Sequence, residues 1–388
     1  MTSRFSIMQP LRKFAAVFFL ALFGLSSCKK EKISPSRSPI MTNRPDSIPA
    51  INTHVIKTQL IWVGNLSQWR LGTAAAAAGN KILFAGGISV DYNSDINGIF
   101  SRVDIYDIIT QVWTTAELSQ ARYNIAAVGA GNKIFFAGGM TATGATSTRV
   151  DIYDVATNSW STAELGEARE NIAAASSGNK ILFAGGESPG PAGVSSRIDI
   201  YDVSSNTWST ATLSERRAGI AAGSAGTKIL FAGGWNANSK SNRVDIYDAA
   251  TNTWSTTALS EAREVTGVTT VGNTIIFASA FGATSSSSYS DRVDMYDAAT
   301  GNWSIDSLNR YDSLGHGYGV NFSGAATSGN FAFFFPSSGI RNFIIYDAGQ
   351  RTWAISSAVL PFGWEAAFVT AHNEIYIAGW EGVWRVQF

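Results

Sequence analysis

The chain has 388 residues, of which 12% are aromatic, 15% are charged and 37 are glycine. This composition is typical of strands joined by tight turns, with enough apolar material to bury a large core. The 29 basic and 29 acidic residues balance, so no basic field indicates a nucleic acid as partner.

The amino terminus carries the pattern of an export signal. Two basic residues precede an apolar run from 14 to 25, which at about a dozen residues is too short to span a bilayer as a permanent helix. The run therefore predicts a signal peptide over residues 1–27. Leu25-Ser-Ser-Cys28 resembles a bacterial lipobox, which implies cleavage before Cys28 and attachment of lipid to that residue. A plain signal peptide with an incidental cysteine is the alternative.

Residues 28–56 are predicted to be a tether. They contain four prolines and a Lys-Lys-Glu-Lys run and show no strand periodicity, which favours a flexible or partly extended segment. We expect it to hold the following domain off a membrane that the protein touches only through the lipid anchor. The expected location is the bacterial cell envelope, at the outer membrane or cell surface. Because Cys28 is the sole cysteine, residues 57–388 must be stable without an intramolecular disulfide.

From residue 57 onward one pattern occurs seven times. Its first landmark is Phe-Ala-Gly-Gly, which stands at 84–87, 136–139, 183–186 and 231–234 and weakens to Phe277-Ala-Ser-Ala280, Phe334-Phe-Pro-Ser337 and Ile377-Ala-Gly-Trp380. A tryptophan recurs at intervals of 46 to 50 residues, at Trp113, Trp160, Trp208, Trp254, Trp303 and Trp353. Each of these is preceded by a tyrosine seven residues earlier. This spacing lies inside the range of propeller blades.

Each unit predicts four strands. The first is rich in small residues, as in 74–78, because inner strands that converge on one axis leave little room. After a glycine-containing turn, a strand such as 81–84 is apolar on both sides because each blade lies between two neighbours. The third strand reads Arg102-Val-Asp-Ile-Tyr106, and we expect its arginine and aspartate to pair with each other between blades. Asp107 and its equivalents are expected to accept backbone hydrogen bonds in the next turn.

The diglycine, tyrosine and tryptophan in this register resemble the kelch repeat. The resemblance covers residues 57–388 and implies an all-β fold, a seven-bladed kelch-type β-propeller. The seventh unit ends at Phe388 without a tryptophan strand of its own. Residues 60–66 include Trp62, which stands 51 residues before Trp113. They are therefore predicted to supply the missing strand and to close the ring at an otherwise exposed sheet edge.

Ligand binding is expected on the face that carries the links between blades and the loops after each diglycine, because those loops vary while the opposite turns are short and uniform. The candidate loop residues are Tyr92, Glu187, Trp235 and Trp380. An arginine recurs in six links, as Arg70, Arg122, Arg169, Arg217, Arg263 and Arg310. In kelch domains that bind acidic peptides, arginines at the matching position contact the ligand, so the resemblance makes these six candidate ligand-binding residues. The alternative is that they bond link carbonyls and pair with Glu170 or Glu264.

The predicted function is a non-catalytic binding module for a glycan or an acidic polymer. Guanidinium groups suit carboxylates and sulfates, and aromatic faces suit sugar rings. A protein-interaction scaffold, with an envelope protein as partner, is the alternative. No cofactor is expected.

Catalysis has weaker support in the sequence. Kelch-type propellers include galactose oxidase, whose copper site needs histidines, tyrosines and a cysteine crosslink. Here His54, His316 and His372 are too scattered to form a metal site, and the only cysteine is Cys28. A sugar epimerase similar to the bacterial sialic acid mutarotases is a further alternative, because it needs only a carboxylate or a histidine beside a bound sugar, such as Glu187 or His316.

Overall fold

The computed structural model describes residues 54–90, 96–190, 193–282, 289–308, 310–311, 317–318, 321–337, 342–360, 366–379 and 382–388. These residues form strands, turns and bends, and none of them belongs to a helix long and apolar enough to cross a membrane. Three of the predicted site residues, Cys28, Tyr92 and Trp380, lie outside the described residues, as does His316.

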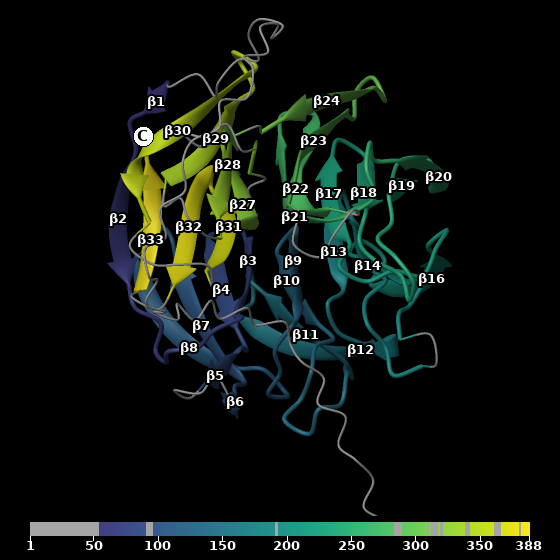
Figure 1. Cartoon of the computed structure of the whole chain (residues 1–388). Coiled ribbons are helices and arrows are strands. Elements are labelled where there is room, and N and C mark those ends of the chain that lie inside the picture. The colour runs from purple at the N-terminus through teal and green to yellow at the C-terminus, as the bar shows by residue number, and fades with distance from the viewer. Residues whose placement is uncertain are drawn as a thin grey trace, which may run out of the picture. The chain divides into compact units, whose positions relative to one another are not determined.

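Seven antiparallel sheets form the blades of a ring (Figure 1). Blade 1 contains β3 (Ala74–Ala78), β4 (Lys81–Ala85), β7 (Arg102–Asp107) and β8 (Val112–Glu117). Blade 2 contains β9 (Ala126–Ala130), β10 (Lys133–Ala137), β11 (Ser147–Asp154) and β12 (Ser159–Arg169). Blade 3 contains β13 (Ala173–Ser177), β14 (Lys180–Ala184), β15 (Arg197–Asp202) and β16 (Thr207–Thr212). Blade 4 contains β17 (Ala221–Ala225), β18 (Lys228–Ala232), β19 (Arg243–Asp248) and β20 (Thr253–Ala258).

The remaining blades depart more from the repeat. Blade 5 contains β21 (Arg263–Val271), β22 (Thr274–Gly282), β23 (Tyr289–Asp297) and β24 (Trp303–Ser307). Blade 6 contains β27 (Phe322–Ser328), β28 (Phe331–Pro336), β29 (Asn342–Asp347) and β30 (Thr352–Val359). Blade 7 contains β31 (Ala367–Ala371), β32 (Glu374–Gly379), β33 (Gly382–Gln387) and β2 (Gln59–Gly64). Two short hairpins lie outside the blades, β5 (Ile88–Val90) with β6 (Ile96–Ile99), and β25 (Arg310–Tyr311) with β26 (Gly317–Tyr318).

The ring is closed by its innermost strands. Each of β3, β9, β13, β17, β21 and β27 contacts the next, β27 contacts β31, and β31 contacts β3. Small residues are required on this inner circle. A Cβ at Gly129 on β9 would come within 1.9 Å of the Ala77 carbonyl oxygen on β3, so the steric reason for the small-residue pattern is confirmed.

Amino-terminal strands join the last two blades. β2 pairs antiparallel with β33, with Trp62 opposite Trp384, and Figure 1 shows the purple β2 beside the yellow β33. The predicted closure of blade 7 is therefore confirmed, with the strand at Gln59–Gly64. A second strand, β1 (Val55–Ile56), pairs in parallel with β30 of blade 6. These two residues had been assigned to the tether, because a two-residue strand has no periodicity to detect.

The diglycine of one blade packs against the link that enters the next blade. Gly86 and Gly87 have φ values of 66° and 104°, in the region that favours glycine. The Gly87 N–H donates to the Arg122 carbonyl oxygen over 3.0 Å. A Cβ at Gly86 would come within 2.5 Å of that same oxygen. The repeated Gly-Gly therefore fixes how closely successive blades pack.

The hydrophobic core lies between neighbouring blades. Phe135 of blade 2 shares one cluster with Phe183 and Tyr201 of blade 3, and the centroids of the Phe135 and Tyr201 rings are 5.1 Å apart. Tyr201 is also opposite Trp208 in the hairpin of β15 and β16, with ring centroids 5.0 Å apart. The constant spacing of tyrosine and tryptophan thus reflects one cross-strand aromatic pair in each of blades 1 to 6.

In blades 1 to 6 the turn after the third strand is held by its aspartate, as predicted. Asp107 Oδ1 accepts from the backbone N–H groups of Ile109 and Thr110 over 2.9 and 3.0 Å, and Oδ2 accepts from Lys81 Nζ over 2.7 Å. The bond from Lys81 holds the pKa of the Asp107 carboxyl well below its usual range. These aspartates are structural residues of the face opposite the links.

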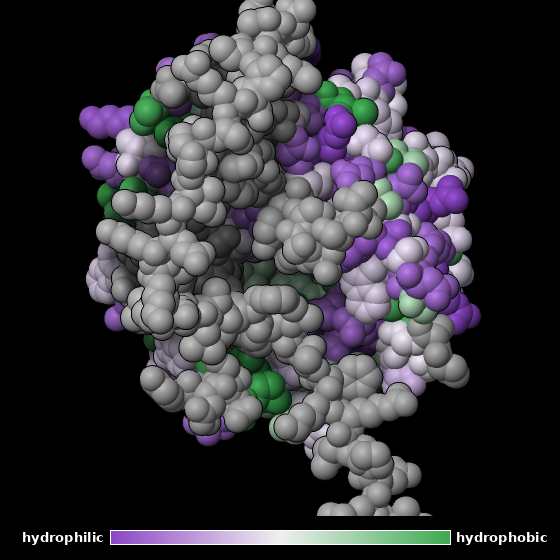
Figure 2. Space-filling view, viewed as in Figure 1, coloured by the Kyte–Doolittle hydropathy of each residue, from purple (hydrophilic) through white to green (hydrophobic). Residues whose placement is uncertain are grey.

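Outer strands present a mainly polar surface. β16 and β20 share a burial pattern in which four of six residues are exposed and two are half-buried. Figure 2 shows mostly hydrophilic residues on the right side of the view, where these strands lie. The outer strands are therefore a weaker candidate for ligand binding than the link face, where the cavity lies.

Candidate functional site

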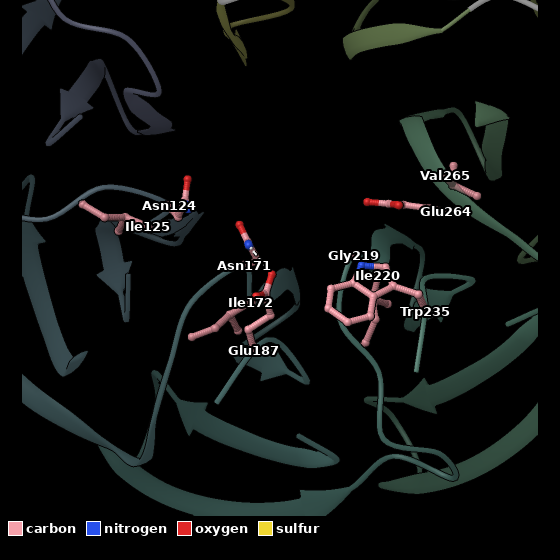
Figure 3. Close-up of a pocket in the computed structure, with 10 residues that line it drawn as sticks. All are labelled: Asn124, Ile125, Asn171, Ile172, Glu187, Gly219, Ile220, Trp235, Glu264 and Val265. Atoms are coloured by element: carbon pink, nitrogen blue, oxygen red, sulfur yellow. Dashed lines mark hydrogen bonds between the residues drawn. The ribbon is translucent and has the colours of Figure 1, made fainter. Parts of the chain in front are cut away.

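A cavity of about 400 Å³ opens where the links enter the inner strands of blades 2 to 5. Its lining residues are Asn124, Ile125, Asn171, Ile172, Glu187, Gly219, Ile220, Trp235, Glu264 and Val265. Figure 3 shows Asn171 and Glu187 on one side of the opening, with Trp235 and Glu264 on another. The predicted binding face is therefore hollowed, and two of the predicted loop residues, Glu187 and Trp235, line the hollow.

In blades 1 to 4 the backbone brings the link beside the loop that follows the diglycine of the same blade. The residue after the link arginine bridges to the residue after the diglycine, as in Glu170 with Glu187 and Ala218 with Trp235. The next link residue turns sharply. Asn124, Asn171 and Gly219 have φ values of 52°, 49° and 60°, a left-handed conformation that asparagine and glycine tolerate. This turn places all three residues at the cavity wall.

Asparagine side chains connect the carboxylates of the site. Asn124 Nδ2 donates to Glu170 Oε2 over 2.8 Å, which joins the link of blade 2 to the link of blade 3. Asn171 Nδ2 donates to Glu187 Oε1 over 2.7 Å. Glu170 itself is buried, with 5% of its surface exposed. Burial raises the pKa of the Glu170 carboxyl, the bond from Asn124 opposes this rise, and the nearby Glu187 carboxylate adds to it.

Gly219 lets the side chains of Trp235 and Glu264 lie close to the backbone at the cavity wall. A Cβ at Gly219 would lie 2.8 Å from Glu264 Oε1 and 2.9 Å from Trp235 Nε1. The other oxygen of Glu264, Oε2, accepts from Lys240 Nζ over 2.6 Å. Because a Cβ at position 219 would come too close to both polar atoms, glycine is needed there for Trp235 and Glu264 to keep these positions.

Five of the six link arginines are buried away from the cavity lining, and this corrects their predicted role as ligand-binding residues. Five of them have guanidinium side chains with 0% exposure, and each forms an ion pair with a buried aspartate. These arginines are Arg70, Arg122, Arg169, Arg217 and Arg263. Arg310 begins β25, and its side chain lies outside the described part of the structure.

Arg122 shows what these arginines do. Its guanidinium donates to the carbonyl oxygens of Gly138 and Arg149 and to Asp151 Oδ2, while Asp151 Oδ1 accepts from the Ser119 backbone N–H over 2.8 Å. The arginine and aspartate together fasten the link to the second and third strands of blade 2. Burial lowers the pKa of Arg122, and Asp151 opposes that change. The predicted bonding to carbonyls is thus confirmed, but the carboxylate partners are the third-strand aspartates.

The third-strand arginines are consequently paired elsewhere than predicted. Arg102 Nε lies 3.1 Å from Glu117 on β8, and Arg149 lies 2.9 Å from Glu164 on β12. Both pairs are exposed at the outer strand, and the aspartates of the same third strands bond the link arginines instead. Arg197 does bond its own Asp199, with Nε 2.9 Å from Oδ1.

The described histidines do not contribute to the cavity. His372 lies in a turn on the opposite face, where its Nε2 is 3.0 Å from the Gly79 carbonyl oxygen. Among the described residues, no cluster of three histidine, cysteine, aspartate or glutamate side chains could hold a metal ion.

This ring of four-stranded blades, with diglycines receiving the links and a polar hollow on the link face, defines a kelch-type β-propeller. Residues 72–277 match the family model for the KLHDC2/KLHL20/DRC7 Kelch-repeats domain. The match covers more than half of the chain and includes every residue that lines the cavity, and the chain belongs to this family. No curated protein matches the chain.

Proposed function

We propose that this kelch propeller is a non-catalytic binding module that takes a glycan into the link-face cavity. The observation that carries the proposal is a half-buried indole, Trp235, beside two carboxylates, Glu187 and Glu264, around one opening. Carboxylate oxygens accept hydrogen bonds from sugar hydroxyls, and an indole face packs on the apolar face of a sugar ring. The volume of about 400 Å³ falls in the range of roughly 300–1,000 Å³ that small-molecule sites occupy.

The charge of the cavity favours a neutral glycan over an acidic polymer. Its charged lining residues, Glu187 and Glu264, are both acidic, and the arginines that had suggested an anionic ligand are buried in ion pairs. An anionic ligand would meet like charge at this opening. The acidic-ligand expectation is therefore replaced by a neutral, hydroxyl-rich one.

A glycan array probed with the purified full-length protein tests this proposal. We expect binding to one or more neutral glycans, with loss of binding in Trp235→Ala and Glu187→Gln. Glu164→Gln is the matched control, because it removes an exposed carboxylate on the outer strand β12. An array without neutral glycan binding, or equal binding by all three variants, would contradict the proposal. Capture of an envelope protein that requires Trp235, on a silent array, would instead support the scaffold alternative.

We also propose that the domain is exported and anchored by lipid at Cys28, so that the cavity faces an envelope glycan. The lipobox-like sequence before Cys28 supports this part of the proposal. Cells expressing the protein can be fed an alkyne fatty acid and the label detected on the purified chain. We expect label on the wild type and none on Cys28→Ala, and label on both variants or on neither would contradict the anchor.

A further inference from the structure

The repeat permits a comparison of one position in three consecutive blades. Two residues after the link arginine, blades 2 and 3 have Asn124 and Asn171, whose amides are bonded to glutamates. Blade 4 has Gly219 in the same left-handed conformation. Without a side chain there, Trp235 Nε1 and Glu264 Oε1 both lie close to Gly219, at 2.9 and 2.8 Å from the point where a Cβ would stand. Figure 3 shows Gly219 beside the Trp235 ring, with the Glu264 carboxylate nearby.

The two atoms have opposite hydrogen-bonding character. An indole N–H can only donate, and a carboxylate oxygen can only accept. A hydroxyl group satisfies both because its oxygen accepts one hydrogen bond and its proton makes another. A protonated amine satisfies only the carboxylate, since it has no lone pair with which to accept from the indole.

We propose that Gly219, Trp235 and Glu264 form a hydroxyl subsite, in which one ligand hydroxyl accepts from Trp235 Nε1 and donates to Glu264 Oε1. This inference rests on the proposed glycan-binding function and specifies how that site recognises its ligand. Gly219 determines specificity by allowing both atoms to lie close to the backbone at the cavity wall, since a Cβ there would displace them. Lys240 positions the carboxylate by bonding its other oxygen, Oε2.

Isothermal titration with methyl β-D-galactoside, methyl β-D-glucoside and methyl α-D-mannoside tests the subsite. Trp235→Phe keeps an aromatic ring and removes the N–H, and we expect it to weaken the bound glycoside about 5- to 10-fold, the scale of one hydrogen bond. Glu264→Gln is expected to weaken binding about 10- to 100-fold, the scale for a bond to a charged group. In this variant the amide oxygen accepts from Lys240 in place of Oε2. The NH₂ group then faces the ligand and donates a hydrogen bond where an acceptor is needed.

A repeat-matched pair of variants tests the role of Gly219. Gly219→Asn introduces the residue that blades 2 and 3 carry in the same backbone conformation, and we expect it to abolish binding. Gly72→Asn makes the same change at the equivalent position of blade 1, where φ is also 60° and no atom lies within 4 Å of the added Cβ. We expect this control to bind as the wild type does. Melting temperatures of both variants verify that they are folded.

Monodeoxy analogues of the best glycoside identify the hydroxyl. One analogue, which loses both hydrogen bonds, is expected to bind the wild type more weakly than the parent glycoside binds Trp235→Phe. The affinity of that analogue should fall little further in Trp235→Phe. If Trp235→Ala abolishes glycoside binding while Trp235→Phe, Glu264→Gln and Gly219→Asn all bind normally, the subsite is wrong and the glycan-binding function stands. If none of the glycosides binds and the glycan array is also silent, the proposed function itself fails.

Discussion

Replacing Arg122 by methionine tests whether the link arginines are structural residues. The side chain is fully buried, bonds two carbonyl oxygens and pairs with Asp151, whose side chain is 3% exposed. Methionine fills similar space but leaves a buried carboxylate without its cation. Breaking a buried pair in this way costs about 3–5 kcal/mol, a large part of the roughly 5–15 kcal/mol that stabilises a typical folded protein.

Chemical and thermal denaturation of the full-length protein measure this loss. We expect Arg122→Met to melt on the order of 10 °C lower than the wild type. The double variant Arg122→Met with Asp151→Leu is expected to recover only part of the loss. An apolar pair replaces the buried ion pair at little cost, but backbone groups that Arg122 and Asp151 bonded lose their partners. Arg102→Ala, which breaks an exposed pair with Glu117, should cost less than about 1 kcal/mol.

If Arg122→Met and Arg102→Ala lower the melting temperature by the same small amount, the structural role of Arg122 is contradicted. It is also refuted if Arg122→Met keeps the wild-type melting temperature and loses glycan binding, because the guanidinium would then serve the ligand rather than the fold.

Three further predictions concern ring closure, the diglycine and the buried carboxyl. Deleting residues 54–64 removes β1 and β2 and exposes the edges of two blades, so the protein should lose its cooperative thermal transition; an unchanged melting temperature would contradict this. Gly138→Ala should lower the free energy of unfolding clearly more than Gly72→Ala. Both positions need a positive φ, which costs alanine about 1–2 kcal/mol, but only at Gly138 does the new Cβ also meet a carbonyl oxygen at 2.5 Å. Glu170→Gln should raise stability at pH 7, since a raised folded-state pKa means that ionising Glu170 destabilises the fold. This gain in stability should disappear below pH 4.5, the pKa of the glutamate in the unfolded chain. A gain that does not depend on pH would contradict the raised pKa of Glu170.

The blades could be predicted from the sequence because their signals are local. The seven-residue spacing from Tyr106 to Trp113 indicates one hairpin. Phe-Ala-Gly-Gly indicates where a strand ends and its glycines pack against the next link. Where the diglycine is replaced by Ser279-Ala280, β22 instead continues to Gly282. Even the closing strand was predictable, since the last unit lacks a tryptophan strand and Trp62 precedes the first.

The partners of charged side chains could not be predicted in the same way. Arg102 and Asp104 are two residues apart on one strand, so sequence spacing favours their pairing. In the fold, Asp104 bonds Arg70, 34 positions earlier in the chain. That contact depends on how the link turns back over the blade, which the sequence pattern does not specify.

Only part of the candidate site could be predicted from the sequence. Glu187 and Trp235 were identified because they follow the diglycines, whose position on the link face is set by topology. Asn124, Asn171 and Gly219 were missed, although asparagine and glycine at a constant distance from the link arginine do indicate a left-handed turn. Glu264 was considered only as a partner for an arginine, whereas it bonds Lys240 and faces the cavity.

A crystal structure of the full-length protein with its strongest-binding neutral glycan tests the central claim most directly. We predict a sugar ring against Trp235, with one hydroxyl oxygen within hydrogen-bonding distance of both Trp235 Nε1 and Glu264 Oε1. A glycan held on another face of the ring, or held by link arginines that have left their aspartates, would contradict it.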